Sequence, residues 1–230
     1  MKKNVMMRIA CFLLVAVLIS TSTISGTYAK YVTEGTGVDT ARVAKWGVAV
    51  DPNGDLFLKA YTDDDADYTG NSVESGNEWK VVAPGTTEDL DEIALTGTPE
   101  VATRVTYEAT VNLDGWKLSN GDEYCPLIFT IEGETYGIVA HCGKAVSHPA
   151  TTVAELAGLI KDALEACKKD YAPLTDLSTK NADYPSLTWA WPFFIDDAHD
   201  VKDTDLGNKA AADQYAVVQV IVKTTVTQID

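Results

Sequence analysis

The chain has 230 residues, of which 34 are acidic and 18 are lysine or arginine, so its formal net charge at pH 7 is −16. A charge of this sign repels phosphate backbones and excludes nucleic acid as an expected partner. The apolar fraction of 46% is ordinary for a globular protein and excludes wholesale disorder, and the length is enough to bury one good core.

The first 29 residues have the order of a secretory signal peptide. A positive n-region is followed by an unbroken apolar run at 9–19 and by a small-residue site that ends at Ala29. We expect a signal peptidase to cut between Ala29 and Lys30, which removes three positive charges and takes the formal net charge from −16 to −19. The alternative is an uncleaved anchor, but the run is shorter than the roughly 20 residues of a membrane span. The mature chain is therefore expected outside the cell, with no membrane attachment.

Segments in which apolar and polar residues alternate with period two predict half-buried strands. The clearest is 101–113, with Val105 on its apolar face. The same alternation covers 216–227 and 187–195, and Pro192 in the latter indicates an edge strand or a bend. Shorter candidate strands are 42–50, 56–61, 78–83 and 90–96.

Residues 125–142 predict a β-hairpin joined by Gly133-Glu134, because glycine in the first position of a two-residue loop suits a type II′ turn. That register places Cys125 opposite Cys142, and an oxidising extracellular setting permits a disulfide between them. The alternative is that both stay reduced, because directly opposed strand cysteines give a bridge of constrained geometry.

One amphipathic helix is predicted at 153–171. Thr152 and Glu155 form a capping box at its start. An apolar stripe at helical spacing follows, made of Val153, Leu156, Ile160, Ala163, Leu164, Cys167 and Tyr171. A stripe of this width is typical of a helix that packs on a sheet. We therefore expect a single, mainly β domain at 30–230, with 125–171 as a hairpin-helix insertion.

Two acidic segments, 62–78 and 196–213, are expected to be surface loops, because both are rich in Asp, Gly and Asn. The first offers a weak calcium candidate in positions 1, 3, 5 and 12 of a calcium loop, namely Asp63, Asp65, Asp67 and Glu74. Tyr68 stands where that pattern requires glycine, so a solvated acidic loop is favoured over a metal site.

No pattern in the chain predicts catalysis. His141, Cys142 and His148 have the side-chain types of zinc ligands, but they lack HExxH or paired CxxC spacing. A GxSxG nucleophile elbow and a glycine-rich phosphate loop are both absent from the sequence. We expect neither an enzyme nor a cofactor.

The five tryptophans have two interpretations, a carbohydrate groove or a packed core. Trp189 and Trp191 share a predicted face with Leu187 and Phe193, which favours core packing for this pair.

Two further stretches stand out, namely residues 26–48, which read GTYAKYVTEGTGVDTARVAKWGV, and the turn Ala83-Pro84-Gly85 before a strand. In these stretches the chain resembles the TasA/camelysin-like exported surface and biofilm-matrix proteins of Gram-positive bacteria, which a dedicated signal peptidase processes. The stretches SLTWAWPF, DTDLGNKAAA and TVTQID resemble uncharacterised clostridial relatives. The resemblance implies a jelly-roll or Ig-like β-sandwich and, for some members, assembly into fibres.

In such fibres a freed N-terminal segment adds as a strand to the next subunit. Here that segment would be 30–50, and the alternative is that 42–50 is an ordinary strand of its own domain. The 125–171 block sets this chain apart from the fibre proteins, and camelysin's protease activity is not carried over because no matching ligand set is present.

The sequence therefore predicts a secreted structural or adhesive protein of a cell surface or biofilm matrix that self-associates. The alternative is a monomeric extracellular module that binds glycans or host proteins through 62–78 and 196–213.

Overall fold

The computed structural model describes residues 42–51, 56–62, 71–89 and 94–229. The described residues from Ala44 onward belong to a second unit of the chain, which begins after Val43 and whose fold is described below. The signal peptide and its cleavage site, Ala29-Lys30, lie outside the described residues.

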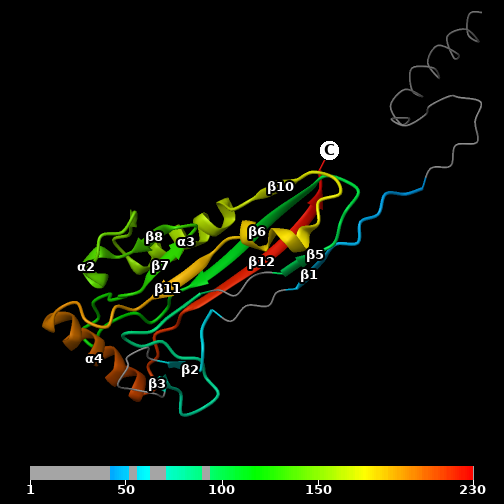
Figure 1. Ribbon diagram of the computed structural model, residues 1–230. Helices are drawn as coiled ribbons and strands as arrows, with labels where there is room; N and C mark the ends of the chain where they lie inside the picture. The colour runs from blue at the N-terminus through cyan, green and yellow to red at the C-terminus, as the bar shows by residue number, and fades with distance from the viewer. Residues whose placement is uncertain (1–41, 52–55, 63–70, 90–93, 230) are drawn as a thin grey trace, which may run out of the picture. The chain divides into compact units, whose positions relative to one another are not determined.

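The second unit is rich in β-structure and has few helices (Figure 1). Its described strands are β1 (Ala49–Asp51), β2 (Ala60–Thr62), β3 (Asn71–Glu74), β4 (Thr87–Asp89), β5 (Ala94–Thr96), β6 (Thr103–Asn112), β7 (Ile128–Ile131), β8 (Glu134–Gly137), β9 (His148–Pro149), β10 (Lys169–Tyr171), β11 (Leu187–Ala190) and β12 (Gln219–Gln228). Its described helices are α2 (Val139–Cys142), α3 (Val153–Ala166), the 3-10 helix η2 (Leu177–Asp183) and α4 (Asp197–Ala211). One sheet has the order β4-β11-β7-β8-β9, another has β10-β6-β12, and β1-β5 and β2-β3 are two-stranded.

The two longest strands, β6 and β12, form an antiparallel pair without a break in register. Val105, Tyr107 and Ala109 of β6 are buried, while the residues between them face outward, as the alternation predicts. Along β12 half-buried and exposed residues alternate in the same way. The strands predicted at 101–113 and 216–227 are thus confirmed.

The predicted hairpin is confirmed, but its predicted register is wrong. Phe129 pairs with Tyr136 and not with Ile138, so the turn is Glu132-Gly133. Both turn residues have positive φ, 51° and 82°, which is the requirement of a type I′ turn. Gly133 takes the second turn position, and Glu132 accepts the left-handed conformation because the flanking strands twist to match a type I′ turn.

The predicted helix begins where expected and ends early. The Thr152 hydroxyl accepts the backbone N–H of Glu155 at 3.1 Å, which confirms the cap. After Ala166 the chain leaves the helix, and β10 pairs with β6. The prediction that the helix continues to Tyr171 is wrong because residues 169–171 satisfy their backbone groups on the sheet instead.

The segment 196–213, predicted as a loop, is mostly the helix α4. The Asp196 carboxylate caps its start by accepting the backbone N–H of His199 at 2.9 Å. Leu206 is its one buried residue among those described, so no apolar stripe marked the helix in the sequence. The strand predicted at 78–83 is also wrong, since this segment is irregular.

The turn at Ala83-Pro84-Gly85 lies directly before β4, as predicted. Gly85 has a φ of 86°, and the Thr86 N–H donates to the Ala83 carbonyl oxygen at 3.0 Å. Proline followed by a residue of positive φ is the pattern of a type II turn.

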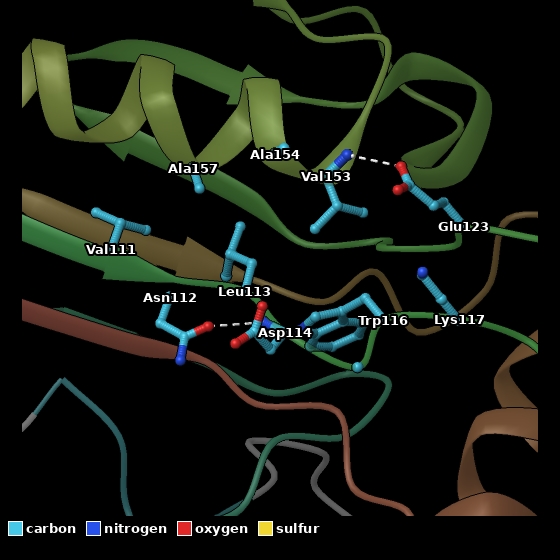
Figure 2. Close-up of a pocket in the computed structure, with 11 residues that line it drawn as sticks. Val111, Asn112, Leu113, Asp114, Trp116, Lys117, Glu123, Val153, Ala154 and Ala157 are labelled. Carbon is cyan, nitrogen blue, oxygen red and sulfur yellow. Dashed lines mark hydrogen bonds between the residues drawn. The ribbon is translucent and has the colours of Figure 1, made fainter.

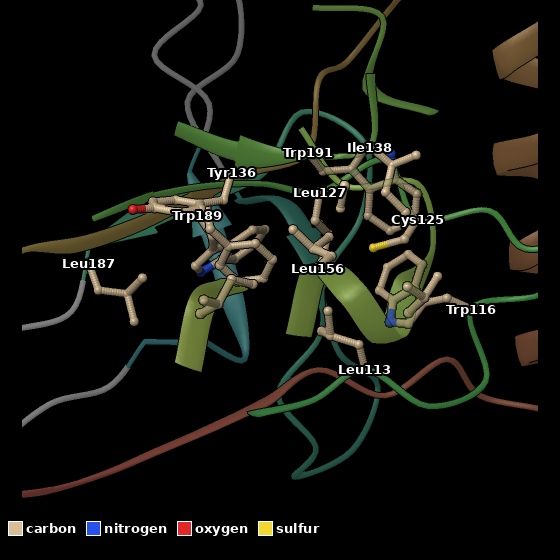
Figure 3. Packing of buried hydrophobic residues seen from close by; sticks show 14 of the residues in the cluster. Leu113, Trp116, Cys125, Leu127, Tyr136, Ile138, Leu156, Leu187, Trp189 and Trp191 are labelled. Carbon is tan, nitrogen blue, oxygen red and sulfur yellow. The ribbon is translucent and has the colours of Figure 1, made fainter. Parts of the chain in front are cut away.

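One large cluster of buried side chains joins the two larger sheets and α3 (Figure 3). It contains Trp116, Trp189 and Trp191, which confirms core packing for the predicted pair. Phe193 was expected on the same face, but it is 77% exposed because β11 ends before Pro192. Since β11 lies between β4 and β7, this proline marks a bend and not a sheet edge. Residues 125–171 contribute β7, β8 and β9 to the five-stranded sheet as well as α3.

Substitution of Gly97 tests how β1 is held against β5. Gly97 has a φ of 122°, and a Cβ there would clash with the Gly47 carbonyl oxygen. We expect Gly97→Ala to lower the free energy of unfolding by roughly 2 kcal/mol. Gly158→Ala on α3, where a Cβ meets open space, should instead raise it by about 0.5–1 kcal/mol. Urea unfolding of both variants checks this, and effects of the same sign would contradict it.

Candidate functional site

The two cysteines predicted to form a disulfide are buried and unbridged. Cys142 is the last residue of α2 and not part of a hairpin strand, so the cross-strand geometry that would place it opposite Cys125 does not arise. Burial raises the pKa of the Cys125 thiol to about 12, which removes thiolate reactivity at neutral pH. The predicted Cys125–Cys142 bridge is therefore corrected to two free thiols.

The state of these thiols is directly measurable. Chain 30–230, unfolded without reductant, should yield three titratable thiols, namely Cys125, Cys142 and Cys167. In the folded protein Cys125 and Cys142 should resist a polar thiol reagent because both are fully buried. Recovery of a single thiol after unfolding would contradict this.

Three of the four predicted calcium ligands, Asp63, Asp65 and Asp67, lie outside the described residues. The fourth, Glu74, is exposed at the end of β3. Across 42–51, 56–62, 71–89 and 94–229, no group of three or more His, Cys, Asp or Glu side chains could hold a metal ion. The calcium loop stays a prediction.

The histidines considered as zinc ligands are engaged in separate contacts. Nδ1 of His141 accepts the backbone N–H of Cys125 at 3.1 Å. The His148 ring stacks on Tyr136 with 4.7 Å between centroids, and its Nε2 is 3.7 Å from a carboxylate oxygen of Glu134. These contacts orient both rings toward neighbouring protein groups.

A polar cluster that the sequence did not reveal surrounds Tyr124, between α2 and α4. The Tyr124 hydroxyl donates to Asp203 at 2.8 Å, and Lys202 Nζ lies 5.3 Å from the ring centroid. The rings of His141 and His199 lie 5.4 and 6.1 Å from the Tyr124 ring. Burial raises the pKa of Tyr124 and of Asp203, and it lowers the pKa of His141. Shifted pKa values of this kind gather at functional sites and also in structural polar networks.

His199 joins α4 to α2 within this cluster. Its Nδ1 is 2.7 Å from Asp196 Oδ1 and its Nε2 is 3.2 Å from the Ala140 carbonyl oxygen. Both partners are acceptors, so both hydrogen bonds form only when the ring carries two protons. In the described part of the chain, no histidine is hydrogen-bonded to a hydroxyl or thiol. The cluster links α4 to Tyr124 through Asp203 and to α2 through His199.

The half-buried carboxyl group of Asp203 gives a pH test of this cluster. Because burial raises its pKa, the folded state binds more protons than the unfolded state between about pH 4 and that raised pKa, so this group lowers stability as pH rises. Asp203→Asn keeps an acceptor for the Tyr124 hydroxyl and removes the half-buried charge. We expect its melting temperature to exceed that of the wild type at pH 7, with the difference shrinking toward pH 4. A difference that is constant with pH would contradict this.

A cavity of about 430 Å³ lies between the first turn of α3 and the end of β6 (Figure 2). Apolar side chains of Val111, Leu113 and Val153 form part of its wall. Its polar groups hold the wall together, since Glu123 accepts the Val153 N–H at 3.0 Å and Asn112 accepts the Asp114 N–H at 2.9 Å. The charged side chains of Asp114 and Lys117 also line the cavity.

β12 has ten residues and lies at one edge of its sheet among the described strands. Ile229 and Val217 donate their N–H groups to Ala102 and Asp114, which fixes the alternation of hydrogen bonds between β12 and β6. Every second residue of β12 therefore points its N–H and C=O groups away from β6, namely Val220, Val222, Thr224 and Val226. No described strand pairs with this side of β12, which is the last strand of its sheet (Figure 1).

Such an edge can accept another strand through its main chain. The sequence predicted self-association from the N-terminus but did not identify an acceptor. The alternation of 216–227 predicted a strand at this place. It could not predict that the strand lies at the edge of its sheet, because that depends on the order of strands in the folded protein.

Comparison with known proteins gives no relative: no family model, no curated protein and no solved structure matches the chain. Among the described helices, none combines the length and apolar character needed to cross a membrane.

Proposed function

We propose that this chain is an exported structural or adhesive protein of a Gram-positive cell surface or biofilm matrix, and that it self-associates by strand addition at β12. The single observation that carries the assembly is the ten-residue β12, whose outer edge no described strand covers. The order of the first 29 residues and the resemblance of 26–48 to exported matrix proteins support export.

The strand that adds to this edge comes from the N-terminal segment of a second copy. β1 (Ala49–Asp51) pairs with β5 of its own chain, and the Glu100 N–H donates to the Lys45 carbonyl oxygen at 2.9 Å. These contacts hold residues from Lys45 onward in their own unit, which begins at Ala44. The segment proposed for donation is therefore shortened from 30–50 to 30–43.

We propose that the fold is a jelly-roll or Ig-like β-sandwich. Supporting this, two mainly antiparallel sheets contribute side chains to one shared core. The protein acts without a cofactor and without enzymatic turnover.

Electron microscopy of chain 30–230 and of chain 44–230 tests the assembly. We expect filaments from the longer chain and dispersed particles from the shorter one, because the shorter chain lacks the donated segment. Dispersed particles from both chains at every concentration would remove self-association from the proposal.

A matched pair of substitutions at Thr224 tests the acceptor edge. Thr224→Pro removes an outward N–H and leaves the hydrogen bonds to β6 in place, because proline is tolerated where the strand N–H faces solvent. Thr224→Val keeps that N–H. We expect filaments from Thr224→Val and none from Thr224→Pro, with unchanged melting temperatures. Filaments from both variants would exclude β12 as the acceptor.

A further inference from the structure

Trp79 and Tyr215 form an exposed aromatic pair. Their side chains come from segments far apart in sequence, the irregular stretch before β4 and the stretch before β12. The ring centroids are 5.8 Å apart at an interplanar angle of 32°, and the two residues are 67% and 50% exposed. Large aromatic residues are ordinarily buried when their purpose is to stabilise a core, so two adjacent rings facing solvent need another explanation.

Polar contacts hold the main chain at Trp79 and the ring of Tyr215. Asn77 Oδ1 accepts the backbone N–H of Trp79 at 2.8 Å, and it also accepts the hydroxyl of Ser75 at 3.1 Å. The Tyr215 hydroxyl donates to Asp213 at 2.8 Å. The pair is therefore organised before any ligand arrives, which reduces the entropy lost on binding.

The main chain of Tyr215 is also fixed. Gly115 has a φ of 80°, and a Cβ there would lie 2.6 Å from the Tyr215 carbonyl oxygen. Two residues later, the Val217 N–H donates to the Asp114 carbonyl oxygen, and the Trp116 indole N–H donates to the Val217 carbonyl oxygen at 2.9 Å. A turn anchored in the core thus supports the exposed ring.

The geometry of the pair limits what can bind. Rings 5.8 Å apart touch each other, so no ligand fits between them and only their outer faces and edges are available. The exposed carboxylate of Asp213 lies on the segment that carries Tyr215, and the chain has a net charge of −16, although Glu78 beside Trp79 is paired with Lys59 at 2.8 Å. An anionic membrane or a phosphate-bearing ligand is therefore disfavoured. Two rings are also far smaller than the roughly 800 Å² per partner of a stable protein interface.

We infer that Trp79 and Tyr215 form a binding platform for a neutral polysaccharide. A pyranose ring presents a face of C–H groups that stacks on an aromatic ring. Its hydroxyls at the rim can donate to the Asp213 carboxylate and can accept from the side-chain NH2 group of Asn77. A linear chain of such sugars lying across both rings matches an open platform that has polar groups at its border. This platform is separate from the β12 edge and does not depend on filament formation.

Affinity electrophoresis of chain 30–230 tests the platform, in gels that contain hydroxyethyl cellulose, xylan or dextran, with pull-down on cellulose and chitin particles. We expect retention by at least one of these polysaccharides, and an affinity about tenfold lower for Trp79→Ala, a loss of about 1.4 kcal/mol. Tyr215→Phe should bind within about twofold of the wild type because it keeps the ring. Trp46→Ala, which removes a partly exposed tryptophan outside the pair, should bind as the wild type does.

Retention by none of the five polysaccharides would overturn the inference, as would equal retention of Trp79→Ala and the wild type. Equal binding to anionic vesicles and to the polysaccharides would also overturn it, since that result indicates a non-specific apolar patch. Tyr215→Ala provides a second variant, and melting temperatures confirm that each variant is folded. If Trp79→Ala loses polysaccharide binding and Thr224→Pro keeps it, the binding platform is independent of the β12 edge that is proposed for assembly.

Discussion

The hydrogen bond from the indole of Trp189 to the carbonyl oxygen of Leu56 is the contact on which the rest of the unit depends. It measures 2.6 Å and lies in the interior, where a lost partner would cost about 1–3 kcal/mol. The same indole contacts the rings of Phe57 and Tyr61. The Tyr61 hydroxyl in turn accepts the Leu58 N–H and donates to the Val81 carbonyl oxygen, both at 2.9 Å. One side chain of β11 thus holds the segment 56–61 on the core. Through Tyr61 it also holds Val81, which lies just before the turn that leads into β4.

The two sides of the β10-β6-β12 sheet differ in how their main-chain groups are paired. On one side, β10 covers only the first residues of β6, and farther along the Ala109 N–H donates to the Glu165 carboxylate of α3 at 3.2 Å. A helix therefore protects the part of β6 that no strand covers, which is a common way to prevent unwanted pairing. On the other side of the sheet, no described strand pairs with β12. The two outer sides of this sheet therefore differ in how much of their main chain is paired.

Local patterns predicted the elements that local forces determine. The alternation around Val105 predicted β6, and the pair Thr152 and Glu155 predicted the start of α3. The predictions failed where a distant partner decides the outcome. The helix predicted to continue to Tyr171 ends at Ala166 because the edge of β6 captures the next residues, and α4 has too few buried residues to produce a stripe. The Tyr124 cluster and the Trp79–Tyr215 pair each join segments separated by many residues, so neither leaves a motif in the sequence.

The pairing of β6 with β12 also determines when the protein can finish folding. Glu108 and Lys223, which form an ion pair across these strands, are 115 residues apart in the chain. β12 is the last described strand in the chain, so its pairing with β6 can begin only after β12 has been synthesised. Closing so long a loop then slows the pairing further. Until β12 has been made, β6 lacks the partner with which it forms its longest ladder. The sheet β10-β6-β12 is therefore among the last parts of the unit to be completed.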